Sequence, residues 1–274
     1  MHNWTKRLFV LFAPLLLAAC LWGPGKFTSD LTVKKDGSLI LNYRGEMVLQ
    51  LPPEASSEPW KPEMARCYAG GKTLGSVGVM VPSGSPPPKE RPCTAAEIAD
   101  QKSAYEKKLK DSENMAKAFG LPGLDDESNR AFAAKLMKYA GWRSVTYRGN
   151  GLFDVDYHFE GRATQDFLFP ALPDNDLLIP FIALRRRADG SVLVTAPAFT
   201  GGSGPLAARA GAAAAGEMKE GPVSHAQGRF TVITDGEILT NNSEDGASPH
   251  AIGRQVHWDV GPSSNKIPET LIRL

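Results

Sequence analysis

The chain has 274 residues, with 31 Lys and Arg against 30 Asp and Glu, and 42% of its residues are hydrophobic. Such a near-neutral balance gives no electrostatic reason to expect nucleic acid as a partner, because that needs clustered positive charge. The hydrophobic content is enough for a real core, while 27 Gly and 21 Pro predict many turns and loops.

The N-terminus follows the pattern of an export signal. Lys6 and Arg7 precede an apolar segment, residues 8–19, which is too short to cross about 30 Å of hydrocarbon. The run Leu17-Ala18-Ala19-Cys20 that closes it resembles the lipobox of bacterial lipoproteins. This resemblance implies that the Cys20 thiol receives a diacylglycerol, that the chain is cut before it, and that the new amino group is acylated. A cleaved secretory signal with a chance cysteine is the alternative.

We therefore expect residues 1–19 to be a lipoprotein signal peptide and residues 20–25 a lipidated tether. Leu21, rather than aspartate, follows the cysteine. In a host with two membranes, the resemblance to Gram-negative lipoproteins then implies the periplasmic face of the outer membrane, with the membrane as a partner through the lipid.

Cysteine usage agrees with export. Of three cysteines, lipidation of Cys20 leaves Cys67 and Cys93 as an even pair. We predict a disulfide between them that pins the Pro- and Gly-rich loop 50–93, since an oxidising compartment permits it. Two free buried thiols are the alternative, and a metal site would need more ligands than this pair supplies.

Two amphipathic helices are predicted in the middle of the chain. The first opens with the capping box Thr94-Ala95-Ala96-Glu97 and ends at Gly120 and Pro122. The second starts near Asp125 or Asp126 and ends before Gly141. Their apolar stripes are interpreted as core faces rather than partner sites.

Strands are predicted on both sides of these helices. Residues 26–34 and 38–49 form a hairpin around Asp36-Gly37. An antiparallel meander follows the helices, in the ranges 142–148, 152–160, 162–169, 177–185 and 191–196. The predicted fold class is α+β, an antiparallel sheet of hairpin plus meander with two amphipathic helices packed on one face.

One main domain is expected. It covers residues 26–199, and a C-terminal strand pair within residues 223–274 completes it. Residues 200–222, rich in Gly and Ala, are predicted to be a linker or loop between the two parts.

The densest polar cluster is Asp154, Asp156, His158 and Glu160, which alternate with apolar residues and so share one face of a strand. Such groups could begin a divalent-metal site or an acid/base pair. The same alternation is typical of a solvated strand face. No nucleophile elbow, phosphate loop, dinucleotide fingerprint or zinc-protease histidine pair occurs in the sequence. We therefore expect neither a cofactor nor a catalytic activity.

Two very apolar segments, residues 167–172 and 177–184, run into the triplet Arg185-Arg186-Arg187. If exposed, they would form a contact patch for lipid or a protein partner. The interpretation that we favour is two buried strands and a solvated turn. The candidate contact residues are Phe169, Leu172, Leu178, Phe181, Arg185, Arg186 and Arg187.

The ends of the chain carry a family resemblance. Residues 27–33 with Asp36-Gly37-Ser38 and Tyr43, and the closing segments 228–232 and 256–260, are similar to lipoproteins of the LppM-like type. The whole chain also resembles uncharacterised alphaproteobacterial lipoproteins. These resemblances imply an α+β envelope lipoprotein. We expect a non-catalytic binding or scaffold module, for a lipid or amphiphile or for an envelope protein. The alternative is a metal-dependent or hydrolytic enzyme that uses Asp154, Asp156 and His158.

Overall fold

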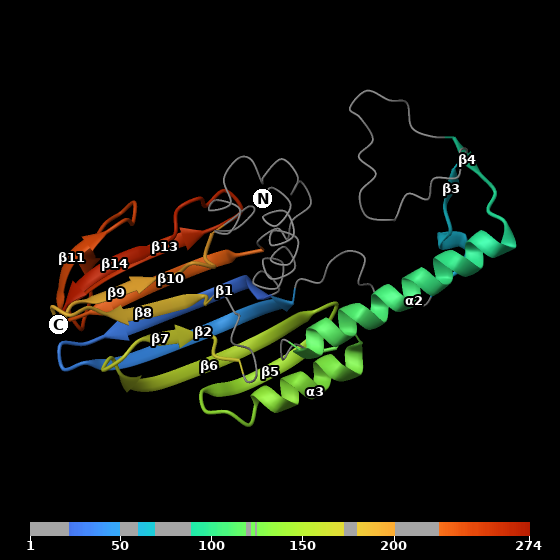
Figure 1. The fold of residues 1–274 in the computed structure, drawn as a ribbon. Helices are drawn as coiled ribbons and strands as arrows, with labels where there is room; N and C mark the ends of the chain where they lie inside the picture. The colour runs from blue at the N-terminus through green and yellow to red at the C-terminus, as the bar shows by residue number, and fades with distance from the viewer. Residues whose placement is uncertain are drawn as a thin grey trace, which may run out of the picture.

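The structure is a computed structural model that describes residues 22–49, 60–68, 89–118, 122–123, 125–172, 180–200 and 225–274. Its body is a sandwich of a seven-stranded sheet, in the order β12-β13-β10-β1-β2-β6-β5, and a five-stranded sheet, β11-β14-β9-β8-β7 (Figure 1). The strands of the larger sheet are β1 (Trp22–Val33), β2 (Ser38–Leu49), β5 (Trp142–Gly149), β6 (Leu152–Arg162), β10 (Gln227–Thr234), β12 (Ser248–Pro249) and β13 (Arg254–Val260). Those of the smaller sheet are β7 (Phe167–Phe169), β8 (Ile182–Arg186), β9 (Val192–Thr195), β11 (Glu237–Asn241) and β14 (Glu269–Arg273).

The predicted N-terminal hairpin is present as β1 and β2. Asp36 accepts a hydrogen bond from the Ser38 amide at 2.8 Å, and Gly37 takes the positive φ of 81° that the turn needs. The other edge of β1 pairs with β10 in parallel, from Lys26 opposite Gln227 to Val33 opposite Thr234. The prediction of a purely antiparallel sheet is therefore wrong, because a parallel partner so far along the chain leaves no local turn signal.

The predicted meander is divided between the two sheets. β5 and β6 extend the larger sheet, whereas β7, β8 and β9 belong to the smaller one, and the chain crosses over at the fully buried Ala163. Aromatic rings hold the layers together: Tyr43 lies 5.1 Å from Phe169, and Phe27 lies 4.2 Å from Phe199, between ring centroids. The alternation of apolar and polar residues indicates that one face of each strand is buried, but it does not indicate whether a helix or a second sheet covers that face. The prediction of a single sheet is therefore wrong.

The helices α2 (Ala95–Ala118) and α3 (Asp126–Leu136) begin where the sequence predicts. Asp125 caps α3 by accepting from the Ser128 amide at 2.8 Å. The Phe132 ring of α3 stacks on Trp22 at 5.5 Å, so this helix packs on the sandwich. None of the described helices is long and apolar enough to span a bilayer.

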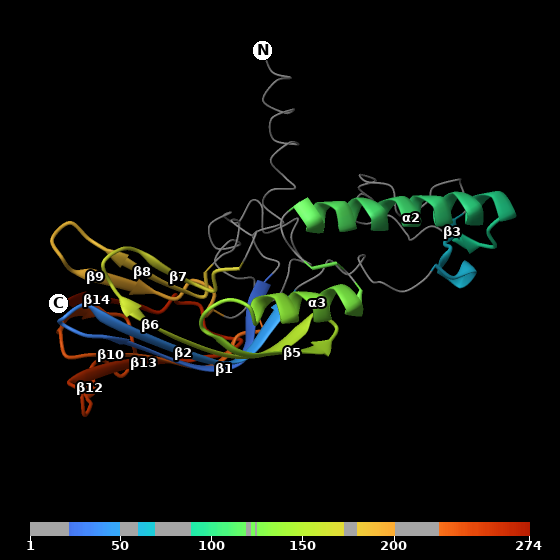
Figure 2. The ribbon, with the colours of Figure 1, turned by 90° about the horizontal axis from the view of Figure 1, so that it is seen from below.

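The position of α2 differs from the prediction that both helices pack on the sheet. Figures 1 and 2 show α2 extending beyond the sandwich, and no described side chain of this helix is buried. Its half-buried Tyr105 lies 5.5 Å from Trp60, which precedes the short helix η2 (Pro62–Met64). The apolar stripe of α2 contains too few apolar residues to require packing against a sheet. The described neighbours of the helix come from the disulfide-bonded segment.

The N-terminal boundary of the body also differs from the prediction of a tether over residues 20–25. Residues 22–25 belong to β1 and all four are buried, since Trp22 packs between Phe132 and Phe153. Residues 1–19, Cys20, Leu178 and residues 201–222 of the expected linker lie outside the described residues. In the C-terminal segment, β10 and β13 pair antiparallel.

Candidate functional site

The polar cluster on β6 lies on the outer face of the seven-stranded sheet, where neighbouring strands supply partners. Asp154 accepts from Arg148 at 2.6 Å, and Asp156 pairs with Arg44 of β2 at 3.4 Å. Their side chains are 43% and 36% exposed, so both ion pairs are open to water. Charged pairs of this kind contribute little to stability. The two carboxylates therefore have separate arginine partners.

His158 is the centre of a chain of hydrogen bonds across three strands. Its Nδ1 lies 2.6 Å from Asn42 Oδ1, and its Nε2 lies 2.9 Å from Glu160 Oε1. The Asn42 amide donates onward to Asp30 at 2.8 Å. Both ring nitrogens thus lie within hydrogen-bond distance of a side-chain oxygen.

Metal binding by this face finds no support in the geometry. Among the described residues, no three His, Cys, Asp or Glu side chains are grouped closely enough to hold an ion. His158 and Glu160 remain an imidazole–carboxylate pair that could exchange a proton, but the pair lies on an open sheet face. Asn42 and Arg44, the cross-strand partners, are not singled out by the sequence. Only the register of β2 on β6 reveals them.

The apolar residues of the predicted contact patch are not available for contact. Phe169 and Phe181 are fully buried and Leu172 is 7% exposed, because they fill the core between the two sheets. Exposed loops are therefore ruled out for these three residues, whose burial agrees with the favoured interpretation of buried segments, and Leu178 lies outside the described part. Arg185, Arg186 and Arg187, in contrast, are exposed at the end of β8 and in the turn to β9.

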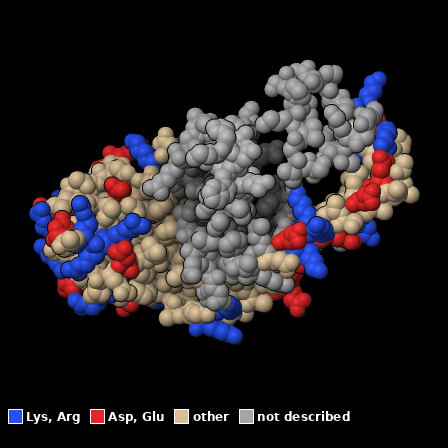
Figure 3. Space-filling model, viewed as in Figure 1, with Lys and Arg blue, Asp and Glu red and all other residues tan. Residues whose placement is uncertain are grey.

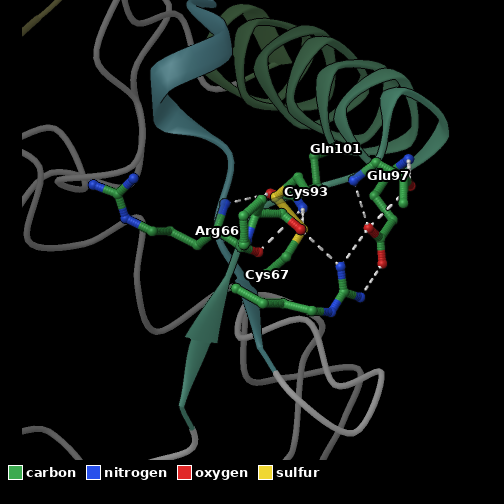
Figure 4. Close-up of polar contacts among 8 residues, drawn as sticks. Arg66, Cys67, Cys93, Glu97 and Gln101 are labelled. Carbon is green, nitrogen blue, oxygen red and sulfur yellow. Dashed lines mark hydrogen bonds and ion pairs between the residues drawn. A yellow bond between two sulfur atoms is a disulfide. The ribbon is translucent and has the colours of Figure 1, made fainter.

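The predicted disulfide is confirmed, since Cys67 and Cys93 are bonded across a separation of 26 residues. It joins β3 (Cys67–Tyr68) to the residues that follow β4 (Glu90–Arg91), and these two short strands pair. Gln101 of α2 accepts from the Arg66 amide at 3.1 Å and donates to the Arg66 carbonyl at 3.2 Å (Figure 4). We call residues 60–68 with 89–118 the arm. A surface cavity of about 410 Å³ beside the disulfide is lined by Arg66, Arg91 and Ile98 among others.

Glu97 links the start of α2 to the β3–β4 hairpin of the arm through hydrogen bonds. Its carboxylate accepts from the Arg91 guanidinium at 2.9 Å and from the Thr94 amide at 2.9 Å. These hydrogen bonds, with that of Arg91 the strongest, lower the pKa of Glu97 from 4.5 to about 2. The predicted capping box is thus present and is reinforced by an arginine.

A second cavity, of about 290 Å³, opens where two loops connect the sheets. Asn242 fixes these loops: its Oδ1 accepts from Trp258 Nε1 and from the Glu269 amide, both at 2.9 Å. The rim carries His257, which lies 3.2 Å from Asp245, and the side chains of Glu244 and Lys266. The lining mixes both charge signs and shows no constellation that assigns a reaction.

No protein-family model matches the chain, and no curated protein matches it.

Proposed function

We propose that this protein is a lipid-anchored lipoprotein of the bacterial envelope whose folded body is a non-catalytic binding or scaffold module. Its partner would be a lipid or amphiphile, or an envelope protein. In a host with two membranes the proposed location is the periplasmic face of the outer membrane. The proposal includes the resemblance to LppM-like lipoproteins, which depends on the strand segments 27–33, 228–232 and 256–260.

The observation that carries the proposal is where the folded body begins. Trp22 is buried in the sandwich only two residues after Cys20, so a lipid on Cys20 would lie next to the folded body. The disulfide supports an oxidising compartment, because such bonds persist mainly in exported proteins.

Intact mass spectrometry of the protein purified from its native membrane tests the proposal. We expect a chain that begins at Cys20 and carries acyl mass, and a gain of two hydrogens on reduction, from the Cys67–Cys93 bond. The Cys20→Ala variant should lack the acyl mass while keeping the disulfide. An unmodified chain cleaved at another residue would refute the lipoprotein assignment and reopen the enzyme alternative.

A further inference from the structure

One end of the sandwich gathers basic side chains from turns of both sheets, and we call it the basic pole. The strand register brings the turns of the larger sheet to one end. Val33, the last residue of β1, lies opposite Leu39 of β2 and Thr234 of β10. Arg254 of β13 lies opposite Thr234, and Arg162 of β6 lies opposite Ser38 of β2. Figure 3 shows Lys and Arg side chains in blue gathered, with acidic side chains among them, at the end that carries the C-terminus. The pole comprises the cations Lys34, Lys35, Arg162, Arg185, Arg186, Arg187, Arg254 and Arg273, and the acids Asp36, Asp166, Asp189, Asp235 and Glu237.

The acids of the pole are outnumbered, and several of them hold its turns. Asp36 and Asp189 accept from Ser38 and Ser191, and these hydrogen bonds lower the pKa of both carboxyls. Arg186, in turn, donates to the carbonyl oxygen of Ala163 at 3.1 Å, a contact that orients its guanidinium without neutralising it. The pole therefore presents a net positive surface on convex turns.

The pole lies at the far end of β1 from the proposed lipid anchor. β1 runs for 12 residues from Trp22 to Val33, which is about 36 Å at the usual strand rise. Cys20 precedes Trp22 by two residues, a reach of about 7 Å. If the protein is anchored as proposed above, its long axis can lie along the bilayer, with the pole against the same leaflet. A covalent anchor makes the headgroups of that leaflet the most concentrated anions nearby.

We propose that the basic pole is a second membrane contact, which binds anionic phospholipid headgroups of the leaflet that holds the lipid anchor. Clustered Arg and Lys side chains bind such surfaces at about 1 kcal/mol each. Ile252, 44% exposed in the turn that precedes Arg254, supplies an apolar side chain for the interface. A protein partner fits less well, because the residues that define the pole lack the aromatic centre that dominates protein interfaces.

Vesicle binding by the unacylated chain tests the pole separately from the anchor. The chain would begin at residue 20 with Cys20→Ser, since the described core starts at Trp22. We expect it to sediment with vesicles of phosphatidylcholine and phosphatidylglycerol, not with phosphatidylcholine alone, and to dissociate as salt rises. Replacing Arg185, Arg186 and Arg187 by alanine should weaken binding roughly 100-fold, at a factor of about five for each cation.

Two further variants keep the test specific. Arg185→Ala/Arg187→Ala retains the Arg186 contact with Ala163, so it should fold normally and still lose binding by roughly 25-fold. Replacing Arg44, Arg148 and Arg229 by alanine removes the same charge from the outer face of the larger sheet, where each pairs with an aspartate. This control should keep its binding. If the control lost as much vesicle binding, binding would depend on net charge alone, and the proposal that the pole is the contact would be overturned.

Other results would also overturn the proposal. Binding to soluble poly-L-glutamate without binding to anionic vesicles would assign the pole to an acidic polymer or protein. In proteoliposomes of the acylated protein, a dye on Ala188→Cys should be quenched by quenchers at the headgroups. An unquenched dye on a chain that binds vesicles would place the pole away from its own membrane. Because the vesicle assay uses unacylated protein, failure there leaves the lipoprotein proposal standing, and the mass measurement decides that proposal independently.

Discussion

At the scale of single residues, Glu97 is the carboxylate whose titration the structure changes most clearly. Arg91 and Thr94 lower its pKa to about 2 from the usual 4.5. Since the folded pKa is the lower one, the charged form stabilises the folded arm. This contribution is fully present above about pH 4.5 and is lost as the pH falls toward 2.

We therefore expect an NMR titration of the Glu97 side-chain carboxyl to give a midpoint near 2. Because the Arg91 guanidinium is the largest cause of the shift, Arg91→Ala should move the midpoint up toward 4.5. Arg130→Ala removes an arginine that pairs with Asp126 instead, and it should leave the midpoint unchanged. A midpoint that does not move in Arg91→Ala would show that the hydrogen bond is not made in solution.

A substitution at Gly228 tests the parallel pairing of β1 with β10. A Cβ atom at this position would lie 1.8 Å from the carbonyl oxygen of Phe27, the residue opposite. Gly228→Ala should therefore lower the free energy of unfolding by about 1–3 kcal/mol or more, through overpacking, in urea titrations. Gly261→Ala, where nothing lies within 4 Å, is the matched control and should cost much less. Equal effects would argue against the parallel register.

At the scale of elements, local signals predicted what is local. The capping box at Thr94, the cap at Asp125 and the Asp36-Gly37 turn each depend on residues within a few positions, and each lies where predicted. The parallel partner of β1, the second sheet and the free position of α2 depend on residues far apart in sequence. Alternating strands on their own do not determine which sheet each strand joins.

The arm should be energetically separate from the sandwich. Replacing both Cys67 and Cys93 by serine removes a crosslink that spans 26 residues, worth about 3–4 kcal/mol in the chain-entropy model. Because the described side chains of α2 are not buried in the core, the cost should fall on the arm. Hydrogen exchange should quicken in residues 60–68 and 89–101, whereas amides of β2 and β6 keep their protection. Faster exchange in both regions would mean that the arm and the sandwich unfold together.

At the scale of the whole molecule, part of the candidate surfaces could be predicted from the sequence. The alternation on β6 placed Asp154, Asp156 and His158 on one face, and the arginine triplet at the end of β8 is exposed as its charge suggests. The cross-strand partners of β6 could not be predicted, since they depend on register. The basic pole could not be assembled either, because its turns come from segments that only the sandwich brings to one end.

The boundary of the body gives a last prediction. Residues 22–25 are buried and Trp22 pairs with Leu49, so a chain that begins at residue 21 should be as stable as one that begins at Cys20. A chain that begins at Lys26 loses the Trp22 ring from between Phe132 and Phe153. Its free energy of unfolding in urea should fall by at least about 3 kcal/mol, the usual cost of deleting a large buried aromatic side chain. Equal stability of the two chains would mean that residues 22–25 form a tether after all, and that a lipid on Cys20, as proposed, would hold the body more loosely than β1 implies.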